Sequence, residues 1–228
     1  MSARPTALVT GASRGVGAAV ARALAPTHDL LLGGRDRDAL DGVAAELPGA
    51  RPWPVELTAV TAADVAGIDR LGVLVHSAGV ATLGRIEEAP AEVWRRTMEV
   101  NVVAVAELTR LLLPALRAAG GHVVLVNSGA GRRANPTWGS YAASKFALRA
   151  FADALRLEEP GLRVTTVYPG RVDTDMQRGV REQENGAYEP DKYLRADSVA
   201  RAVLAAVTAS PDAHITEITV RPSAGPAN

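Results

Sequence analysis

The chain has 228 residues, 47% of them hydrophobic, and its 25 basic residues are balanced by 25 acidic ones. A chain of this size can bury a large core, and without a basic surplus neither nucleic acid nor an anionic membrane is an expected partner. It has no cysteine for disulfides or thiolate ligands, and its four histidines lack metal-ligand spacing, so no metal site is expected.

Short apolar runs alternate with amphipathic segments along the whole chain. Seven of these runs are predicted strands: 6–10, 29–33, 51–57, 72–76, 121–128, 162–169 and 214–220. The alternation is typical of βαβ units, and nearly continuous apolar runs indicate a sheet covered by helices on both faces. The sequence therefore predicts one α/β domain over residues 1–228, with a Rossmann-type doubly wound parallel sheet of about seven strands.

A glycine-rich turn follows the first predicted strand. Gly11, Gly15 and Gly17 precede the helical run 18–25. Glycines there let the backbone approach a pyrophosphate, whose charge then lies at the positive end of the helix. The glycines alone would also fit a tight turn without a ligand.

Charged residues near the next strand end indicate which dinucleotide fits. Gly34 stands where an NAD-binding protein would place a carboxylate, and Arg35 follows it. Arg35 and Arg14 could clamp the 2′-phosphate of NADP, or they could be solvated, since all but two of the 25 basic residues are arginine. Glu56, at the end of the third predicted strand, is either an adenine contact or an ordinary strand-end acid.

Proton chemistry is indicated by Tyr141 and Lys145, which share one face of the helical run 140–159. A phenol is a weak acid at neutral pH, but a neighbouring ammonium favours the phenolate. Ser128 ends the fifth predicted strand, where its hydroxyl could polarise a substrate carbonyl or simply form a turn. Asn101 lies in an apolar helical stripe, where its amide could satisfy backbone groups or hold a water linking Lys145 to solvent.

Taken together, these motifs resemble those of the short-chain dehydrogenases/reductases over essentially the whole chain. The matching motifs are TGASRGVG, the SAG from Ser77 to Gly79, Asn101, Ser128, YAASK and the PGRVDT from Pro169 to Thr174. The resemblance implies a catalytic tetrad of Asn101, Ser128, Tyr141 and Lys145, with Tyr141 as general acid in reduction and general base in oxidation. One departure is His76–Ser77, where the family commonly has two asparagines; we interpret His76 as structural.

NADP(H) is the expected cofactor, and the turn chemistry and the resemblance together indicate its contacts. The expected contacts are Gly11, Ser13, Arg14, Gly15, Val16, Gly17, Arg35, Glu56, Leu57, Ser77, Ala78, Gly79, Tyr141, Lys145, Pro169, Gly170, Val172 and Thr174.

The substrate is expected between the segment after Ser128 and a lid over about residues 175–193, which shows no strong apolar periodicity. We expect this lid to be mobile and to become ordered when the cofactor binds. The candidate substrate contacts are Ala130, Arg132, Arg133, Asn135, Trp138, Met176 and Tyr188.

The sequence thus predicts an NADPH-dependent oxidoreductase that interconverts a small-molecule carbonyl and a secondary alcohol. Alcohol oxidation is an alternative direction, and a catalytically silent NADP(H)-sensing protein is an alternative of another class. The apolar helices with Asn101 and Tyr141, and the resemblance, predict a homodimer or homotetramer. With no apolar run long enough for a signal peptide or membrane span, we expect a cytoplasmic protein without a membrane partner.

Overall fold

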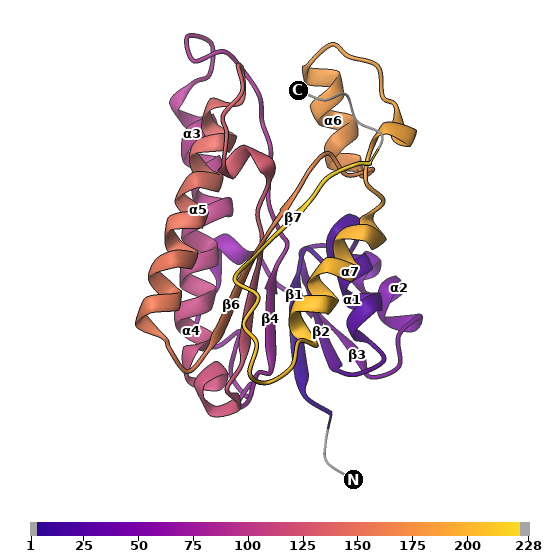
Figure 1. Ribbon diagram of the computed structural model, residues 1–228, viewed down its shortest axis with the longest axis vertical. Helices are drawn as coiled ribbons and strands as arrows, with labels where there is room; N and C mark the ends of the chain where they lie inside the picture. Colours follow the sequence, from indigo (N-terminus) through magenta and orange to yellow (C-terminus); the bar gives the residue numbers. More distant parts are fainter. Residues whose placement is uncertain (1–3, 224–228) are drawn as a thin grey trace.

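Seven parallel strands form one sheet at the centre of the computed structural model, which describes residues 4–223 (Figure 1). The strands are β1 (Thr6–Thr10), β2 (Asp29–Gly34), β3 (Ala50–Pro54), β4 (Val73–His76), β5 (His122–Val126), β6 (Arg163–Pro169) and β7 (Glu217–Val220). Their order across the sheet is β3-β2-β1-β4-β5-β6-β7. All seven predicted strands are therefore present.

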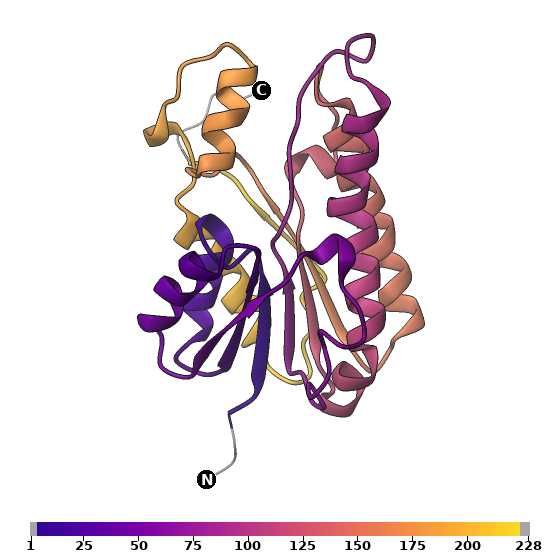
Figure 2. The ribbon, with the colours of Figure 1, turned by 180° about the vertical axis from the view of Figure 1, so that it is seen from behind.

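Helices cover both faces of this sheet. They are α1 (Gly15–Leu24), α2 (Arg37–Ala45), α3 (Ala91–Met98), α4 (Ala104–Ala119), α5 (Gly139–Glu158), α6 (Asp175–Gln183) and α7 (Ala196–Val207). One face holds α1, α2 and α7, and the other holds α4 and α5 with α3 (Figures 1 and 2). The predicted single Rossmann-type α/β fold is confirmed.

The central strands are buried on both faces because their side chains alternate between two apolar clusters. In β1, Ala7 and Val9 pack into the cluster that includes residues of α1 and α7, whereas Leu8 packs with residues of α4 and α5. These three side chains are fully buried, while the edge strands β3 and β7 remain partly exposed. This pattern explains why the inner strands have nearly continuous apolar sequences.

The chain changes direction across the sheet at β1. From β1 it passes outward to β2 and β3, and then returns to β4 on the other side of β1. A parallel sheet opens a crevice at the carboxyl ends of the strands at such a point. The short helix α6 stands beyond this end of the sheet, apart from the helices that cover its faces (Figures 1 and 2).

One long helical segment contains a local irregularity. Between α3 and α4 the backbone forms a π-helical turn over Glu99–Val103, with Asn101 at its centre. Such turns insert an extra residue into a helix and are frequent at functional sites. The turn presents the Asn101 side chain toward the loop after β4, where it hydrogen-bonds to Val80.

Two predicted boundaries differ from the structure. The third strand ends at Pro54, and Glu56 instead caps a short 3₁₀ turn over Leu57–Ala59 by accepting from the Thr58 backbone N–H. The segment predicted as a mobile lid without strong apolar periodicity contains helix α6, which Thr174 caps by accepting from the backbone N–H of Gln177. Across residues 4–223, no helix is long and apolar enough to cross a membrane.

Candidate active site

A cavity of about 1270 Å³ lies at the carboxyl ends of the central strands, between the glycine turn and α6. This volume exceeds the roughly 300–1,000 Å³ of common small-molecule pockets, as a site for a ligand as large as a dinucleotide requires. All eighteen expected cofactor contacts line it: Gly11, Ser13, Arg14, Gly15, Val16, Gly17, Arg35, Glu56, Leu57, Ser77, Ala78, Gly79, Tyr141, Lys145, Pro169, Gly170, Val172 and Thr174.

The glycine turn between β1 and α1 is built for close backbone approach. Gly11 has a φ of 67°, and a Cβ there would lie 2.9 Å from the Cα of Ala78. A Cβ at Gly17 would lie 2.1 Å from the carbonyl oxygen of Gly11. Only glycine fits these positions, and the turn leaves the N-terminus of α1 facing the cavity, where a pyrophosphate would be stabilised.

The end of β1 also holds the turn that follows β4. The hydroxyl of Thr10 accepts from the backbone N–H groups of Ser77 at 3.1 Å and Ala78 at 3.2 Å. His76, just before this turn, is buried, and its Nε2 lies 2.9 Å from the hydroxyl of Thr109. The Thr109 hydroxyl donates to Val105, so Nε2 of His76 is the donor, and the histidine links β4 to α4 as a structural residue.

Three arginine side chains, those of Arg35, Arg14 and Arg96, line the end of the cavity next to the glycine turn. The side chain of Arg35 is 70% exposed and lies 3.9 Å from the Glu56 carboxylate. Arg14 forms an exposed ion pair with Asp175 of α6 at 3.4 Å. A third guanidinium, that of Arg96 on α3, also lines the cavity. Exposed ion pairs of this kind contribute little to stability. Arg35 and Arg14 can therefore exchange their carboxylate partners for a phosphate at a small cost in free energy.

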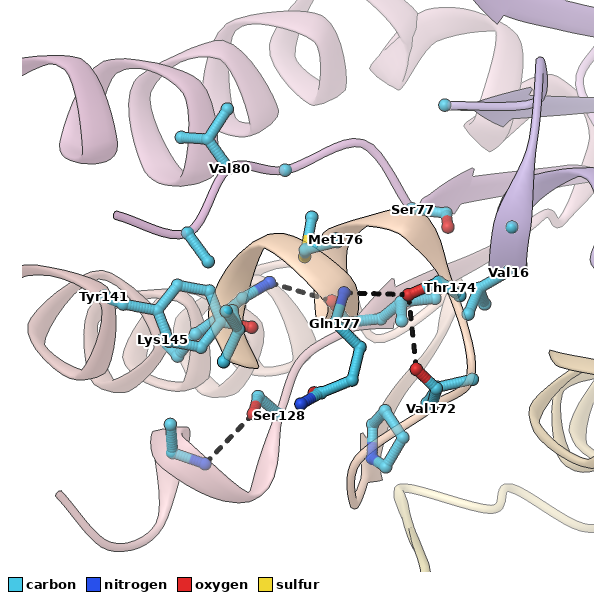
Figure 3. Close-up of a pocket in the computed structure, with 18 of the residues that line it drawn as sticks. Val16, Ser77, Val80, Ser128, Tyr141, Lys145, Val172, Thr174, Met176 and Gln177 are labelled. Atoms are coloured by element: carbon cyan, nitrogen blue, oxygen red, sulfur yellow. Dashed lines mark hydrogen bonds between the residues drawn. The ribbon is translucent and has the colours of Figure 1, made fainter. Parts of the chain in front are cut away.

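Three predicted catalytic residues meet at the other end of the cavity. Tyr141 and Lys145 lie side by side on α5, and Ser128 lies at the end of β5 (Figure 3). The Nζ atom of Lys145 is 5.7 Å from the centroid of the Tyr141 ring and donates to the Val126 carbonyl at 3.1 Å. Both side chains are buried, with 7% of Tyr141 and 5% of Lys145 exposed.

Burial dominates the proton equilibria of this pair. It raises the pKa of Tyr141 above its ordinary value, while the hydrogen bond with Ser128 acts in the opposite direction. It also lowers the pKa of Lys145 to about 8. These shifts come from burial and from Ser128, so the expectation that the neighbouring ammonium favours the phenolate stays a prediction.

Asn101 does not line the cavity but lies behind it. Its Oδ1 accepts from the Val80 N–H at 2.9 Å, and its Nδ2 donates to the Val80 carbonyl at 2.9 Å and to the Ser144 hydroxyl at 3.0 Å. Ser144 in turn donates to the carbonyl of Tyr141 at 2.7 Å. The side-chain amide thus satisfies local polar groups and links the loop after β4 to the helix that bears Tyr141.

The structure separates the candidate substrate contacts into two groups. Ala130, Arg133, Asn135, Trp138 and Met176 line the cavity. Arg132 and Tyr188 do not, contrary to the expectation. The guanidinium of Arg132 lies 4.0 Å from the Tyr168 ring centroid and pairs with Glu217, which directs it away from the cavity.

Tyr188 is likewise held outside the cavity. Its hydroxyl donates to the carboxylate of Asp173, and its ring lies under the guanidinium of Arg178 at 4.1 Å. Burial and the Asp173 carboxylate raise the pKa of Tyr188 to about 12, so it stays a neutral hydrogen-bond donor.

Hydrogen bonds and ion pairs hold the C-terminal end of helix α6 against both walls of the cavity. At its C-terminal end, Gln183 accepts from the backbone N–H of Leu83 at 2.8 Å, and Glu184 accepts from the indole of Trp138 at 3.2 Å. Glu184 also pairs with Arg171 at 2.8 Å and with Arg181 at 2.6 Å. These contacts hold the lid over the end of the cavity that contains Tyr141.

The sequence profile described as short chain dehydrogenase matches residues 5–185, which include the glycine turn, Ser128, Tyr141 and Lys145. The chain belongs to the short-chain dehydrogenase family. Among its relatives, an uncharacterized oxidoreductase of Staphylococcus epidermidis is 31% identical and covers 95% of this chain and 96% of its own length. Glycine betaine reductase of Emericella nidulans is 34% identical, but this chain spans only 18% of that longer protein.

Solved structures of other dehydrogenases share the fold. An alcohol dehydrogenase from Thermococcus sibiricus, complexed with 5-hydroxy-NADP, superposes with a TM-score of 0.88 at 28% identity and covers 99% of this chain and 100% of its own. A Burkholderia cenocepacia short chain dehydrogenase in complex with NADP gives 0.79 at 30% identity and covers 95% of this chain and 88% of its own. This short-chain dehydrogenase therefore has the general role of an oxidoreductase.

Sequence reasoning misses several residues that line this cavity, among them Asn127, Arg96 and Gln177. Asn127 accepts from the Ser128 N–H at 2.7 Å and donates to the Lys145 carbonyl at 3.0 Å, so it links the end of β5 to α5. Its place beside Ser128, as an amide ending an apolar strand, was an available signal. Arg96 and Gln177 reach the cavity through the packing of α3 and α6, and no local pattern indicates this.

Proposed function

We propose that this protein is an NADP(H)-dependent reductase that interconverts a small-molecule carbonyl and a secondary alcohol. The observation that supports it best is the convergence of Ser128, Tyr141 and Lys145 at one end of a cavity whose other end is a phosphate-binding glycine turn. A binding protein that only senses the dinucleotide would need the glycine turn but not the buried tyrosine and lysine.

NADP(H) is the dinucleotide that the residues of the cavity fit. Arg35 and Arg14 provide cations beside the expected ribose, and Gly34 provides no carboxylate there. The T. sibiricus and B. cenocepacia relatives, solved with NADP-type ligands, support the same choice. When bound, the reduced nicotinamide would supply the hydride to the substrate.

The chain's own residues would manage the substrate oxygen and its proton. In reduction, the Ser128 hydroxyl donates a hydrogen bond to the carbonyl oxygen and polarises it. Tyr141 donates its proton to the same oxygen as negative charge develops there, and accepts it back in alcohol oxidation. The Lys145 ammonium lies beside the phenol and stabilises the phenolate that remains. Val172 and Thr174 would hold the nicotinamide amide.

The reaction is tested by following NADPH absorbance with a panel of ketones and aldehydes. The proposal predicts turnover of some carbonyl compounds with NADPH. Tight NADPH binding without turnover of any member would instead support the sensing protein. Running the reaction backwards with alcohols and NADP⁺ tests oxidation as the alternative direction.

The cofactor preference is tested by Arg35→Ser. Loss of a charge-assisted contact should weaken NADPH binding by about 10- to 100-fold and leave NADH binding unchanged. Arg37→Ser is the matched control, because Arg37 is an exposed arginine two residues away that does not line the cavity. Equal losses for NADPH and NADH would contradict the assignment of Arg35.

We also propose that the protein self-associates through α4 and α5 as a homodimer or homotetramer. Val103 in the π turn is 49% exposed, and Phe146 and Leu157 on α5 are 42% and 84% exposed. The π turn leads directly into α4, which lies beside α5 on one face of the sheet (Figure 2). Light scattering should give a multiple of the chain mass of 23.7 kDa, and a species of 23.7 kDa alone would overturn this proposal.

A further inference from the structure

Gln177 presents an unpartnered amide to the active-site cavity. Only 7% of the residue is exposed, and it lines the cavity from the first turn of α6. Within residues 4–223, its Nε2 atom is buried and has no hydrogen-bond partner. A buried amide donor without an acceptor is costly in a folded protein, so such a group in a functional cavity calls for an explanation.

The local helix geometry does not use this amide. Gln177 is the third residue of α6, and its backbone N–H donates to the capping hydroxyl of Thr174 at 3.3 Å. In a capping box, the glutamine at this position would turn back toward the N-cap residue. Here the side chain instead extends from α6 toward Ser128, at the catalytic end of the cavity (Figure 3).

The direction of the side chain indicates which ligand would supply the acceptor. In the proposed function, Ser128 contacts the reacting carbonyl oxygen, whereas Val172 and Thr174 hold the nicotinamide. An amide directed at Ser128 therefore meets the substrate close to its reacting carbon. A primary amide donates hydrogen bonds to oxygen, so the complementary group is an oxygen substituent.

We propose that Gln177 is a specificity-determining residue that selects carbonyl substrates with an oxygen substituent on the carbon next to the reacting carbonyl. The inference rests on the proposed reductase function and adds a substrate class to it. A site with a buried hydrogen-bonding group rejects an analogue that lacks the matching group, because the protein group is then left unpaired.

The test compares hydroxyacetone with butanone, in which a methyl group replaces the hydroxyl. The quantity measured is the ratio of kcat/KM for the two ketones, with NADPH as reductant. Gln177→Met keeps the side-chain volume and removes the amide, so the ratio should fall by about tenfold. The difference in intrinsic reactivity between the two ketones cancels when the variant's ratio is compared with that of the wild-type enzyme.

Glu182→Met is the matched control, since Glu182 is an exposed polar residue on the same helix that does not line the cavity. It should leave the ratio unchanged. An unchanged ratio in Gln177→Met would overturn the proposal. So would a weakened NADPH affinity in Gln177→Met, measured by nucleotide fluorescence, together with an unchanged ratio, because Gln177 would then serve the cofactor.

A second measurement needs no turnover and so separates this inference from the proposed function. In ¹⁵N-labelled enzyme loaded with NADP⁺, the side-chain amide signals of Gln177 are those that disappear in Gln177→Met. They should shift on addition of hydroxyacetone and not on addition of butanone. Signals that stay in place with saturating hydroxyacetone would contradict the role of Gln177, whereas failure of the whole carbonyl panel would contradict the reductase function.

Discussion

Lys145 illustrates how burial adjusts a single side chain for chemistry. Desolvation lowers its pKa to about 8, so the amine is largely charged at pH 7 and loses its proton as the pH rises past 8. The chain contains only one other lysine, Lys192, so labelling lysine with ¹³C at Cε gives two signals. One signal should titrate near pH 8 and disappear in Lys145→Arg. Titration of the Lys145 signal near the ordinary lysine value would contradict the burial seen here.

At the level of single residues, sequence reasoning works where local geometry decides the outcome. The spacing of Tyr141 and Lys145 on one helix fixes their shared face, and all the predicted cofactor contacts line the cavity. The direction of Arg132 depends instead on Tyr168 and Glu217, which are distant in sequence. Gln177 is similar, since its side chain lines the cavity only because of where α6 lies.

The lid is the element whose character was least predictable. The sequence shows no strong apolar periodicity there and predicts a mobile segment. The structure has helix α6, which buries little and is held mainly by polar contacts such as those of Gln183 and Glu184. The sequence did contain a capping signal, since Thr174 is followed three residues later by Gln177. Short polar helices of this kind escape predictions that rely on apolar periodicity.

The lid should become harder to cleave when the cofactor binds. Asp175, Met176 and Gln177 of α6 line the cavity, so a bound dinucleotide would contact the first turn of the lid helix and hold it in place. Trypsin can cut within the lid at Arg178, Arg181 and Lys192, and NADPH should slow these cuts. Equal cleavage rates with and without NADPH would contradict this coupling. Cleavage of an unrelated protein with NADPH present controls for inhibition of trypsin.

For the whole molecule, the parallel sheet of seven strands and its two covered faces could be predicted from the sequence, whereas the strand order comes from the structure. Seven apolar runs separated by helical segments leave few arrangements other than a covered parallel sheet. The exact end of β3 is less clear, because Val55 still donates to Gly34 of β2 beyond the last strand residue. Such boundaries depend on tertiary hydrogen bonds rather than on composition.

The stability of the whole molecule should depend on its buried histidines. Burial lowers the pKa of His76 and of His122 to about 3, against 6.5 for a free histidine. Between these values the unfolded chain binds protons that the folded one does not. Stability is therefore fully present above pH 6.5 and falls as the pH drops toward 3, by about 1.4 kcal/mol per pH unit for each histidine.

Urea unfolding at pH 7 and pH 5 measures this dependence. His76→Gln keeps a side-chain amide that can donate to Thr109 but removes the titrating group. The loss of unfolding free energy between the two pH values should be about 2 kcal/mol smaller in this variant than in the wild type. An identical loss in both proteins would mean that His76 is not buried in its neutral form.

The most direct test of the proposed reductase compares wild-type protein with Tyr141→Phe in single-turnover oxidation of bound NADPH. The substrate is the carbonyl compound that the panel finds to react fastest. Because Tyr141 lies at the end of the cavity away from the phosphate-binding turn, the variant should still bind NADPH. Its rate of NADPH oxidation should fall by at least about 100-fold. Equal rates for the two proteins would contradict the assignment of Tyr141 as the proton donor.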